Sequence, residues 1–264
     1  MTAAALAWPA RMLLRACLSG LAVTCFVWSI GAFAGFWTQS GIAGMAEQIL
    51  QGQTFRPDAI RGLLAEGRTP LLLRAGAPSR FTSRPDHLRN LAVLEMALAE
   101  QAAQSSEVDL LAVLPRLQQV TLTALQASPG DPFLWLMLFW AKSASAGVTS
   151  NTIPLLQRSY ELGANEGWIA LKRIRLSLAS LQSLPPSLGQ RVMAEFRALV
   201  ASGFELSVAE ILAGCEPAIR QRLVDTVVGL PEVNRRKLAE NLVAKGLHDL
   251  AVPGIERTEL RPWM

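Results

Sequence analysis

An uncharged, apolar stretch near the N-terminus constrains this chain more than any other feature. Residues 16–37 read ACLSGLAVTCFVWSIGAFAGFW and include no Asp, Glu, Lys or Arg. About 20 predominantly apolar residues are enough for a helix to cross the hydrocarbon core of a bilayer. A helix that packs at the surface of a protein core keeps one polar face, and this segment has none. The sequence therefore predicts a single membrane-spanning helix over residues 16–37.

The charges on either side of this segment predict its direction. Arg11 and Arg15 precede it, no acidic residue precedes it or lies within it, and the next cation along the chain is Arg56. Flanking positive charge stays on the cytoplasmic side of a membrane. We therefore expect residues 1–15 in the cytoplasm and residues 38–264 in the periplasm, with a single pass through a bacterial inner membrane.

A cleaved signal peptide is the alternative interpretation of this segment. Ala32-Phe33-Ala34 has the small-x-small pattern of a signal peptidase site after an apolar run. The length of the apolar run, which continues through Phe36 and Trp37, favours an uncleaved anchor. Both interpretations export the rest of the chain.

The charge of the exported part argues against one large class of binding protein. The whole chain holds 25 Lys and Arg against 21 Asp and Glu, a net charge of +4. Two of these cations precede the apolar segment, so residues 38–264 hold 23 against 21 and are close to neutral. A nucleic-acid-binding protein concentrates positive charge on one face. We therefore expect no nucleic acid among the partners.

Composition and breaker spacing predict an all-α fold. Ala and Leu dominate, both are strong helix formers, and no segment alternates apolar and polar residues as a half-buried strand does. Pro57 and Pro85 are each followed by aspartate, a pattern typical of a first helical turn. Pro115 is expected to end or kink the helix that contains it. From residue 84 onward, prolines and glycines delimit the expected helices, at residues 84–104, 107–127, 132–146, 151–162, 166–182, 187–202, 206–214, 217–228 and 231–246.

The arginines of residues 56–89 form the first candidate contact surface. This segment holds seven Arg against three acids, a local charge of +4. It follows soon after the predicted membrane exit, where it could contact anionic lipid headgroups or an acidic polysaccharide. Ordinary solvated helix faces are the alternative. The candidate partner contacts in this segment are Arg56, Arg61, Arg84 and Arg89.

The C-terminal tail, residues 247–264, is the second candidate contact surface. Helical periodicity stops before it, and the chain ends in Arg261-Pro-Trp263-Met. An aromatic residue at a chain end is typical of peptide-like docking elements, so Arg261 and Trp263 are candidate contacts. The alternative is that Trp263 folds back onto the domain. The remaining divisions are a helical, Arg-rich linker over 38–90 and a helical domain over 91–246.

Two tryptophans mark a repeated pattern in the centre of the chain. Residues 133–140 are apolar all round but too short to span a membrane, so a buried helix is expected there. Before them, Ala-Leu-Gln-Ala-Ser-Pro129-Gly-Asp-Pro-Phe-Leu-Trp135 ends one helix in a proline turn and opens the next with Trp. Leu155-Leu-Gln-Arg-Ser-Tyr-Glu-Leu-Gly-Ala-Asn-Glu-Gly-Trp168 is similar, and the two tryptophans are 33 residues apart. These two segments resemble the junctions between tetratricopeptide repeats, whose period is about 34 residues.

The resemblance covers about residues 115–182 and has departures. Phe139 stands where that family has a small residue, Lys142 replaces an aromatic residue, and Ala164 replaces the closing proline. What the resemblance implies is an antiparallel helical-repeat domain with a concave surface for protein or polymer segments and no chemistry of its own. We expect its core to include Trp135, Trp140 and Trp168.

The chain shows no motif for catalysis or for metal binding. His87 and His248 are its only histidines, and neither has a companion at metal-ligand spacing. Cys215 is expected to be a small buried apolar residue. A carboxylate pair could still form in space, although each candidate acid is more simply a helix cap or a solvated side chain: Glu95, Asp131, Glu161 and Glu166. We therefore expect no catalytic residue, no metal and no cofactor.

The tether and the resemblance together predict a membrane-anchored periplasmic adaptor or scaffold in a cell-envelope assembly. Its expected partners are the inner membrane and proteins of a membrane complex. Membrane-anchored repeat domains of this kind occur in exopolysaccharide synthesis and export, which we favour by resemblance, and in cytochrome maturation. A non-catalytic structural subunit of a larger membrane complex and a glycan-acting envelope enzyme are the alternatives.

Overall fold

The structure is a computed structural model that describes residues 3–73 and 85–256, and these residues form helices and connecting turns with no strand. The described part is therefore all-α, as predicted. Side chains are described throughout these ranges except at residues 3–11, 13–14, 31–39, 66–73 and 107. The chain divides into two compact units, residues 1–105 and residues 106–264.

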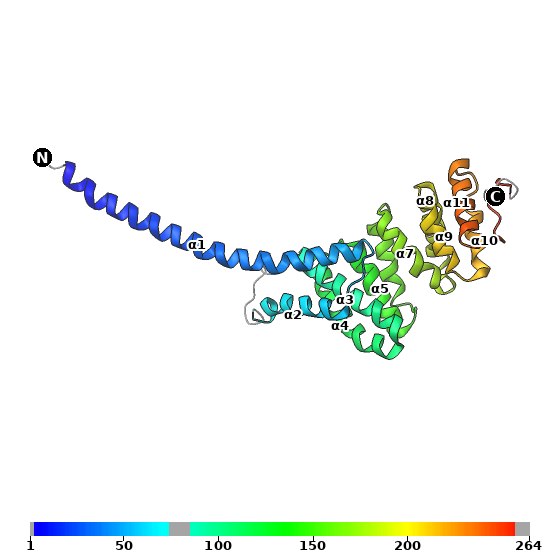
Figure 1. Cartoon of the computed structure of the whole chain (residues 1–264), viewed down its shortest axis with the longest axis horizontal. Helices are drawn as coiled ribbons and strands as arrows, with labels where there is room; N and C mark the ends of the chain where they lie inside the picture. The colour runs from blue at the N-terminus through cyan, green and yellow to red at the C-terminus, as the bar shows by residue number, and fades with distance from the viewer. Residues whose placement is uncertain (1–2, 74–84, 257–264) are drawn as a thin grey trace. The chain divides into compact units, whose positions relative to one another are not determined.

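Unit 1 consists of one long helix and two shorter ones. These are α1 (Ala3–Leu50), α2 (Pro57–Leu73) and α3 (Pro85–Ser105). Figure 1 shows the C-terminal part of α1 lying beside α2 and α3. The two predicted helix starts at Pro57 and Pro85 are confirmed. Helix α1 is much longer than the predicted segment at residues 16–37: it continues through Gly41 and Gly44 and ends just before Gly52, whose φ is 92°.

The core of unit 1 begins only in the last turns of α1. Ile42, Ala46 and Ile49 are buried at helical spacing on that part of α1. They meet Ile60 and Leu64 of α2 together with the buried face of α3. A hydrogen bond of 2.8 Å from the Gln101 side chain of α3 to the backbone oxygen of Phe55 also fixes the turn before α2. The side chains of α1 that the structure describes before residue 31, at Met12 and residues 15–30, are all exposed and take no part in this core.

The predicted membrane segment lies entirely within α1. A search of the described residues finds no helix that is both long enough and apolar enough to cross a membrane. Residues 31–37 of the segment fall outside the residues whose side chains are described. The membrane span over residues 16–37 therefore stays a prediction.

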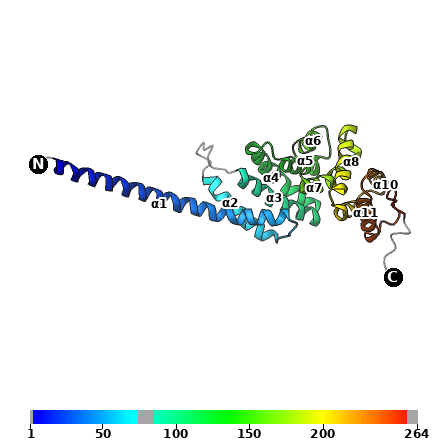
Figure 2. The same ribbon diagram turned by 90° about the horizontal axis from the view of Figure 1, so that it is seen from above.

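Unit 2 is a series of helices joined by short turns, seen from two directions in Figures 1 and 2. The helices are α4 (Glu107–Ala127), α5 (Pro132–Ala146), α6 (Ile153–Leu162), α7 (Gly167–Ala179), the 3-10 turn η1 (Leu181–Ser183), α8 (Pro186–Ala201), α9 (Glu205–Ala213), α10 (Pro217–Asp225) and α11 (Glu232–Ala244). The helices predicted from residue 84 onward are all present, with ends shifted by a few residues. Four pairs of chain neighbours pack together, namely α4 with α5, α5 with α6, α7 with α8 and α8 with α9, and α7 and α11 also pack against α9.

Helix α5 is the centre of the unit 2 core, as its apolar sequence predicts. Asp131 caps its N-terminus by accepting hydrogen bonds from the backbone amides of Phe133 (2.8 Å) and Leu134 (3.3 Å). Most of residues 132–139 are buried. Gly163, at the end of α6, lies so close to Pro132 that a Cβ atom there would be 2.7 Å from the proline ring. A side chain at position 163 would therefore force α5 and α6 apart.

Of the two outcomes expected at Pro115, an end of the helix is not found, because Pro115 is exposed inside α4, which continues to Ala127. The three tryptophans expected in the core are not fully buried: Trp135 and Trp140 are half-buried, and Trp168 is 39% exposed while its ring packs against Phe133. Trp135 stays half-buried because its indole nitrogen donates a 2.8 Å hydrogen bond to the backbone oxygen of Pro129.

Candidate functional site

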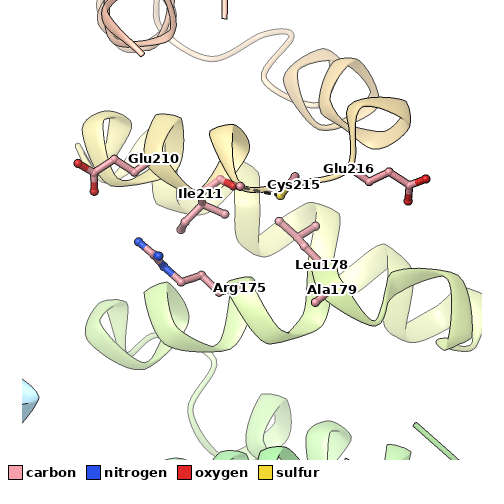
Figure 3. Close-up of a pocket in the computed structure, with 8 residues that line it drawn as sticks. Arg175, Leu178, Ala179, Glu210, Ile211, Cys215 and Glu216 are labelled. Carbon is pink, nitrogen blue, oxygen red and sulfur yellow. Dashed lines mark hydrogen bonds between the residues drawn. The ribbon is translucent and has the colours of Figure 1, made fainter. Parts of the chain in front are cut away.

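A pocket of about 260 Å³ lies between α7 and α9 in unit 2. Figure 3 shows Arg175 reaching from α7 toward Glu210 and Ile211 of α9, while Glu216 points away at the other end. The lining residues come from two adjacent turns of α7 and from the end of α9 with its following turn: Arg175, Leu178, Ala179, Glu210, Ile211, Gly214, Cys215 and Glu216. The result is an apolar floor with charged groups at its rim.

A buried arginine on the other side of α7 fixes the rotation of this helix. Arg173 is fully buried, and its guanidinium forms an ion pair and hydrogen bonds with the Glu195 carboxylate of α8. Because Arg173 points into the core, Arg175 two residues later lies on a different face of the helix. Residues three and four positions further on, Leu178 and Ala179, share the face of Arg175. The buried ion pair therefore presents this face to α9.

The ion pair belongs to a polar cluster in which the arginine is fully satisfied. Arg173 also donates to the backbone oxygens of Ser159 (2.8 Å) and Gly163 (3.0 Å) at the end of α6, and its guanidinium carbon lies 4.2 Å from the centre of the Tyr160 ring. The Tyr160 hydroxyl donates a 2.8 Å hydrogen bond to Glu195. Burial, together with the nearby Glu195 charge, raises the pKa of Tyr160 above its usual value. Burial also raises the pKa of Glu195, while Arg173 acts in the opposite direction.

The charged groups at the pocket rim differ in how far they are already paired. Glu210 accepts a 2.8 Å hydrogen bond from Lys245, and this contact lowers the pKa of its carboxyl group. Glu216 accepts a 2.9 Å hydrogen bond from the Gln182 side chain. Arg175 is exposed and donates no hydrogen bond to any residue that the structure describes. The pocket therefore has one cationic group available to a ligand.

Cys215 lines the pocket but is poorly suited to act as a nucleophile. Its thiol is half-buried and donates to the backbone oxygen of Ile211 at 3.1 Å. Burial raises the pKa of this thiol, and the charges of Arg220 and Arg175 only partly oppose the shift. Arg220 has a structural role here, because it donates to the backbone oxygens of Ala213 and Cys215 and so fixes the turn after α9. The pocket is thus better suited to binding than to chemistry.

Residues 247–256, which we call the C-terminal strap, run against α10 and α11. Ala251 forms two hydrogen bonds with the Gln221 side chain of α10, one through its amide (3.0 Å) and one through its oxygen (2.9 Å). Arg235 of α11 donates to the oxygen of Pro253, and Val252 is buried. Lys245, just before the strap, is the residue that contacts Glu210 at the pocket. The strap therefore follows two residues after a contact with the pocket residue Glu210 and is held against α10 and α11.

A second unusual surface lies on α1. Seven large apolar side chains are exposed there over little more than three turns, each by at least 55%: Leu18, Leu21, Val23, Phe26, Val27, Trp28 and Ile30. Their positions cover all sides of the helix, so no face is left as a polar one. Thr24, one of three hydroxyl-bearing residues interspersed with them, donates a 2.8 Å hydrogen bond to the backbone oxygen of Gly20. An exposed apolar surface of this extent marks an interaction site.

The candidate contacts chosen from the sequence fall partly outside the described residues. Arg84, Arg261 and Trp263 lie in the undescribed segments. Arg56 is exposed just before α2, and Arg61 is exposed within α2, where it pairs with Asp58 at 3.0 Å. Arg89 is half-buried in α3. The candidate arginines that the structure describes, Arg56, Arg61 and Arg89, therefore belong to unit 1, whereas the α7–α9 pocket is built from residues of unit 2.

The acids considered for catalysis have separate roles on separate helices. Asp131 is the cap of α5, as expected. Glu161 is a surface residue paired with Arg158 at 3.0 Å, and Glu166 precedes α7 without capping it. Glu95 is neither a cap nor solvated, because it is only 3% exposed within α3. In the part of the chain that the structure describes, no group of three potential metal-binding side chains comes together.

Sequence reasoning missed Arg173, Arg175 and Glu195. The spacing of Arg175 with Leu178 and Ala179 marks one helix face, but no local signal says that this face meets α9. Comparisons with known protein families, with curated proteins and with solved structures found no match for this chain.

Proposed function

We propose that this protein is a membrane-anchored adaptor whose two helical units act on the outer side of a bacterial inner membrane. The observation that carries the proposal is the exposed, all-round apolar surface on α1 between Leu18 and Ile30. A water-exposed helix with this surface would be unfavourable, at about 25 cal/mol for each Å² of apolar area left in water. A lipid bilayer would cover all sides of the helix at once.

The length and the polar groups of α1 support this anchor. The uncharged segment from Ala16 to Trp37 would extend about 33 Å as a helix, close to the thickness of a bilayer core. Within it, the Thr24 hydroxyl already has a hydrogen-bond partner at Gly20, so this donor stays paired in a bilayer. Arg15 is exposed one residue before the segment, where a cation favours the cytoplasmic side.

The adaptor role follows from what the anchored units offer. Unit 2 has a pocket with an apolar floor, one available cation and a thiol whose pKa is raised, features that suit peptide binding better than catalysis. The resemblance to tetratricopeptide repeats points the same way. A tether restricts the units to the membrane surface and raises their effective concentration near membrane-bound partners. By the same resemblance, the proposed setting of the adaptor is an exopolysaccharide synthesis or export assembly.

The anchor is tested by two charges placed within the apolar surface. A Leu21→Asp/Phe26→Asp variant should lose membrane association, because each charge near the middle of a span costs about 3 kcal/mol. The readout is the fraction of full-length protein that stays in the membrane pellet after alkaline carbonate extraction. A Leu206→Asp/Val233→Asp variant is the matched control, since both residues are exposed apolar side chains of unit 2. Equal extraction of both variants would refute the anchor.

The adaptor role is tested by crosslinking in living cells. The full-length protein should capture membrane-complex subunits that mass spectrometry identifies, and the Leu21→Asp/Phe26→Asp variant should not. Recovery of no specific partner by the wild-type protein would contradict the adaptor role even if the anchor is correct.

A further inference from the structure

Helix α1 itself joins the proposed membrane span to the folded part of unit 1. It is a single helix from Ala3 to Leu50, and the apolar segment within it ends at Trp37. Ile42, a fully buried residue of the unit 1 core, follows only five residues later. Five residues advance a helix by about 7.5 Å. The core of unit 1 therefore begins within about 8 Å of the end of the proposed span.

Helix α2 returns along α1 toward the proposed span, as Figures 1 and 2 both show. A Cβ atom added at Gly41 of α1 would lie 3.6 Å from the Leu63 side chain of α2, so these two positions are level with each other. Gly41 is four residues beyond Trp37, or about 6 Å. A bilayer measures about 40–45 Å with its headgroups and about 30 Å without them, which leaves about 6 Å for each headgroup layer. With Trp37 at the edge of the hydrocarbon core, Leu63 thus lies at the outer boundary of the headgroup layer.

Helix α3 reaches back to the same depth. The hydrogen bond from Gln101 to Phe55 places the C-terminal part of α3 at the turn between α1 and α2, which is the end of unit 1 away from the proposed span. From Gln101 back to Pro85, α3 extends about 24 Å. On α1, the distance from Leu50 at this turn to Trp37 is only about 20 Å. Because α1 and α3 pack against each other, the start of α3 is at the level of the headgroup layer.

Charged residues at the start of α3 suit a headgroup layer and limit how deep the helix can enter. Asp86 is exposed, and His87 and Arg89 are half-buried. Headgroups solvate charges of both signs, whereas a charge within the hydrocarbon core costs about 3 kcal/mol or more. The start of α3 can therefore enter the headgroup layer but not the hydrocarbon core.

We propose that unit 1 rests on the outer leaflet of the membrane, with the start of α3 inside the phospholipid headgroup layer and the turn between α1 and α2 facing away from the membrane. This inference rests on the proposed membrane span, because every depth is counted from Trp37. It assigns the lipid contact to the start of α3 around Asp86 and Arg89. Arg56 lies outside the headgroup layer, because it precedes Leu63 by seven residues, or about 10 Å.

Quenching of single fluorescent labels by spin-labelled lipids tests this depth. Full-length protein in phosphatidylcholine nanodiscs has its three native cysteines replaced by Ser and carries the fluorophore NBD on one new cysteine. Asp86→Cys reports the start of α3, and Gln104→Cys is the matched control, because both residues are exposed on the same helix. A headgroup spin label should quench the label at position 86 about threefold more strongly than the label at position 104, since the two positions are about 27 Å apart. Equal quenching would overturn the proposal.

A second pair of labels on α2 keeps the test independent of any local effect at Asp86. Ala65→Cys lies two residues closer to the membrane than Leu63, and Arg56→Cys lies at the other end of the helix; both residues are exposed. The headgroup spin label should quench the label at position 65 and leave the label at position 56 nearly unchanged. Quenching that is equal at the two positions, or stronger at position 56, would contradict the proposed orientation of unit 1.

The native Cys25 separates a failure of this inference from a failure of the anchor. Cys25 is exposed near the middle of the proposed span, so a label there should be quenched by a spin label placed halfway along the lipid acyl chain. Quenching of the Cys25 label without quenching at position 86 would overturn the resting position of unit 1 and leave the anchor standing. An unquenched Cys25 label would overturn the anchor, and this inference with it.

Discussion

The buried Arg173–Glu195 pair gives the sharpest energetic prediction. Both side chains are almost inaccessible, at 0% and 7% exposure, and Arg173 also satisfies two backbone oxygens at the end of α6. Replacing Arg173 by Met leaves the Glu195 carboxylate buried with the Tyr160 hydroxyl as a remaining partner. Removing one member of a buried ion pair typically costs 3–5 kcal/mol, so we expect a loss of about 4 kcal/mol in the free energy of unfolding.

The two changes together should cost much less than their sum. Glu195→Met alone leaves the Arg173 guanidinium buried without its carboxylate and should also cost about 4 kcal/mol. The double variant removes both charges, and what remains is the loss of hydrogen bonds to Tyr160, Ser159 and Gly163. We expect the double variant to be destabilised by about 5 kcal/mol rather than about 8, a coupling of about 3 kcal/mol.

Urea unfolding of the full-length protein in detergent, followed by far-ultraviolet circular dichroism, measures these differences. Arg236 and Glu232 supply the control pair, because they are also linked by a short contact of 2.7 Å but are both exposed. Their double-variant cycle should show no coupling beyond experimental error. If the Arg173 and Glu195 changes prove additive, the buried pair does not hold α7 against α8, and the explanation for the orientation of the pocket face fails.

Three further predictions concern unit 2. Gly163→Ala should lower the free energy of unfolding by about 1–3 kcal/mol, because the new Cβ would lie 2.7 Å from Pro132. Gly189→Ala inside α8 has room for a Cβ and should raise the free energy of unfolding by about 0.5–1 kcal/mol. Urea unfolding compares the two variants. Asp131→Ala should cost about 1 kcal/mol by the same assay, since it removes the cap of α5, and an unchanged unfolding midpoint would contradict that role. The pH midpoint for alkylation of Cys215 should lie above that of a free thiol, because burial raises the pKa of the Cys215 thiol. Any folding stability that this pKa shift contributes is present at neutral pH and is lost as the pH rises through the folded-state pKa. A midpoint below that of a free thiol would contradict the burial argument.

The helices of this chain could be predicted because local signals set their ends. Prolines open α2, α3, α5, α8 and α10 at the positions the sequence indicates, and apolar residues on all sides of 133–140 place α5 in the core. Pro115 does not end α4, because it lies on an exposed side of that helix, where the lost hydrogen bond is tolerated. Helix α1 continues past Trp37 to Leu50, and neither Gly41 nor Gly44 ends it.

The pocket could not be predicted because its parts come from distant segments. Arg173 has a charged sequence neighbourhood like that of any surface arginine, and its partner Glu195 lies 22 residues further along, in another helix. Arg175 faces α9, and sequence alone gives no reason to pair α7 with α9 when α8 lies between them in the chain. For Trp168 the prediction was wrong in the opposite direction: its place in the repeat-like pattern predicted a buried side chain, but this side chain is 39% exposed.

The direction of membrane insertion tests the central claim most directly. Single cysteines at Thr2→Cys and Gln53→Cys, in full-length protein with Cys17, Cys25 and Cys215 replaced by Ser, report the two sides of the proposed span. A membrane-impermeant maleimide should label Gln53→Cys in intact cells with a permeabilised outer membrane, and label Thr2→Cys only after lysis. Labelling of Gln53→Cys only after lysis would place the helical units in the cytoplasm and contradict the account of an outer-side adaptor.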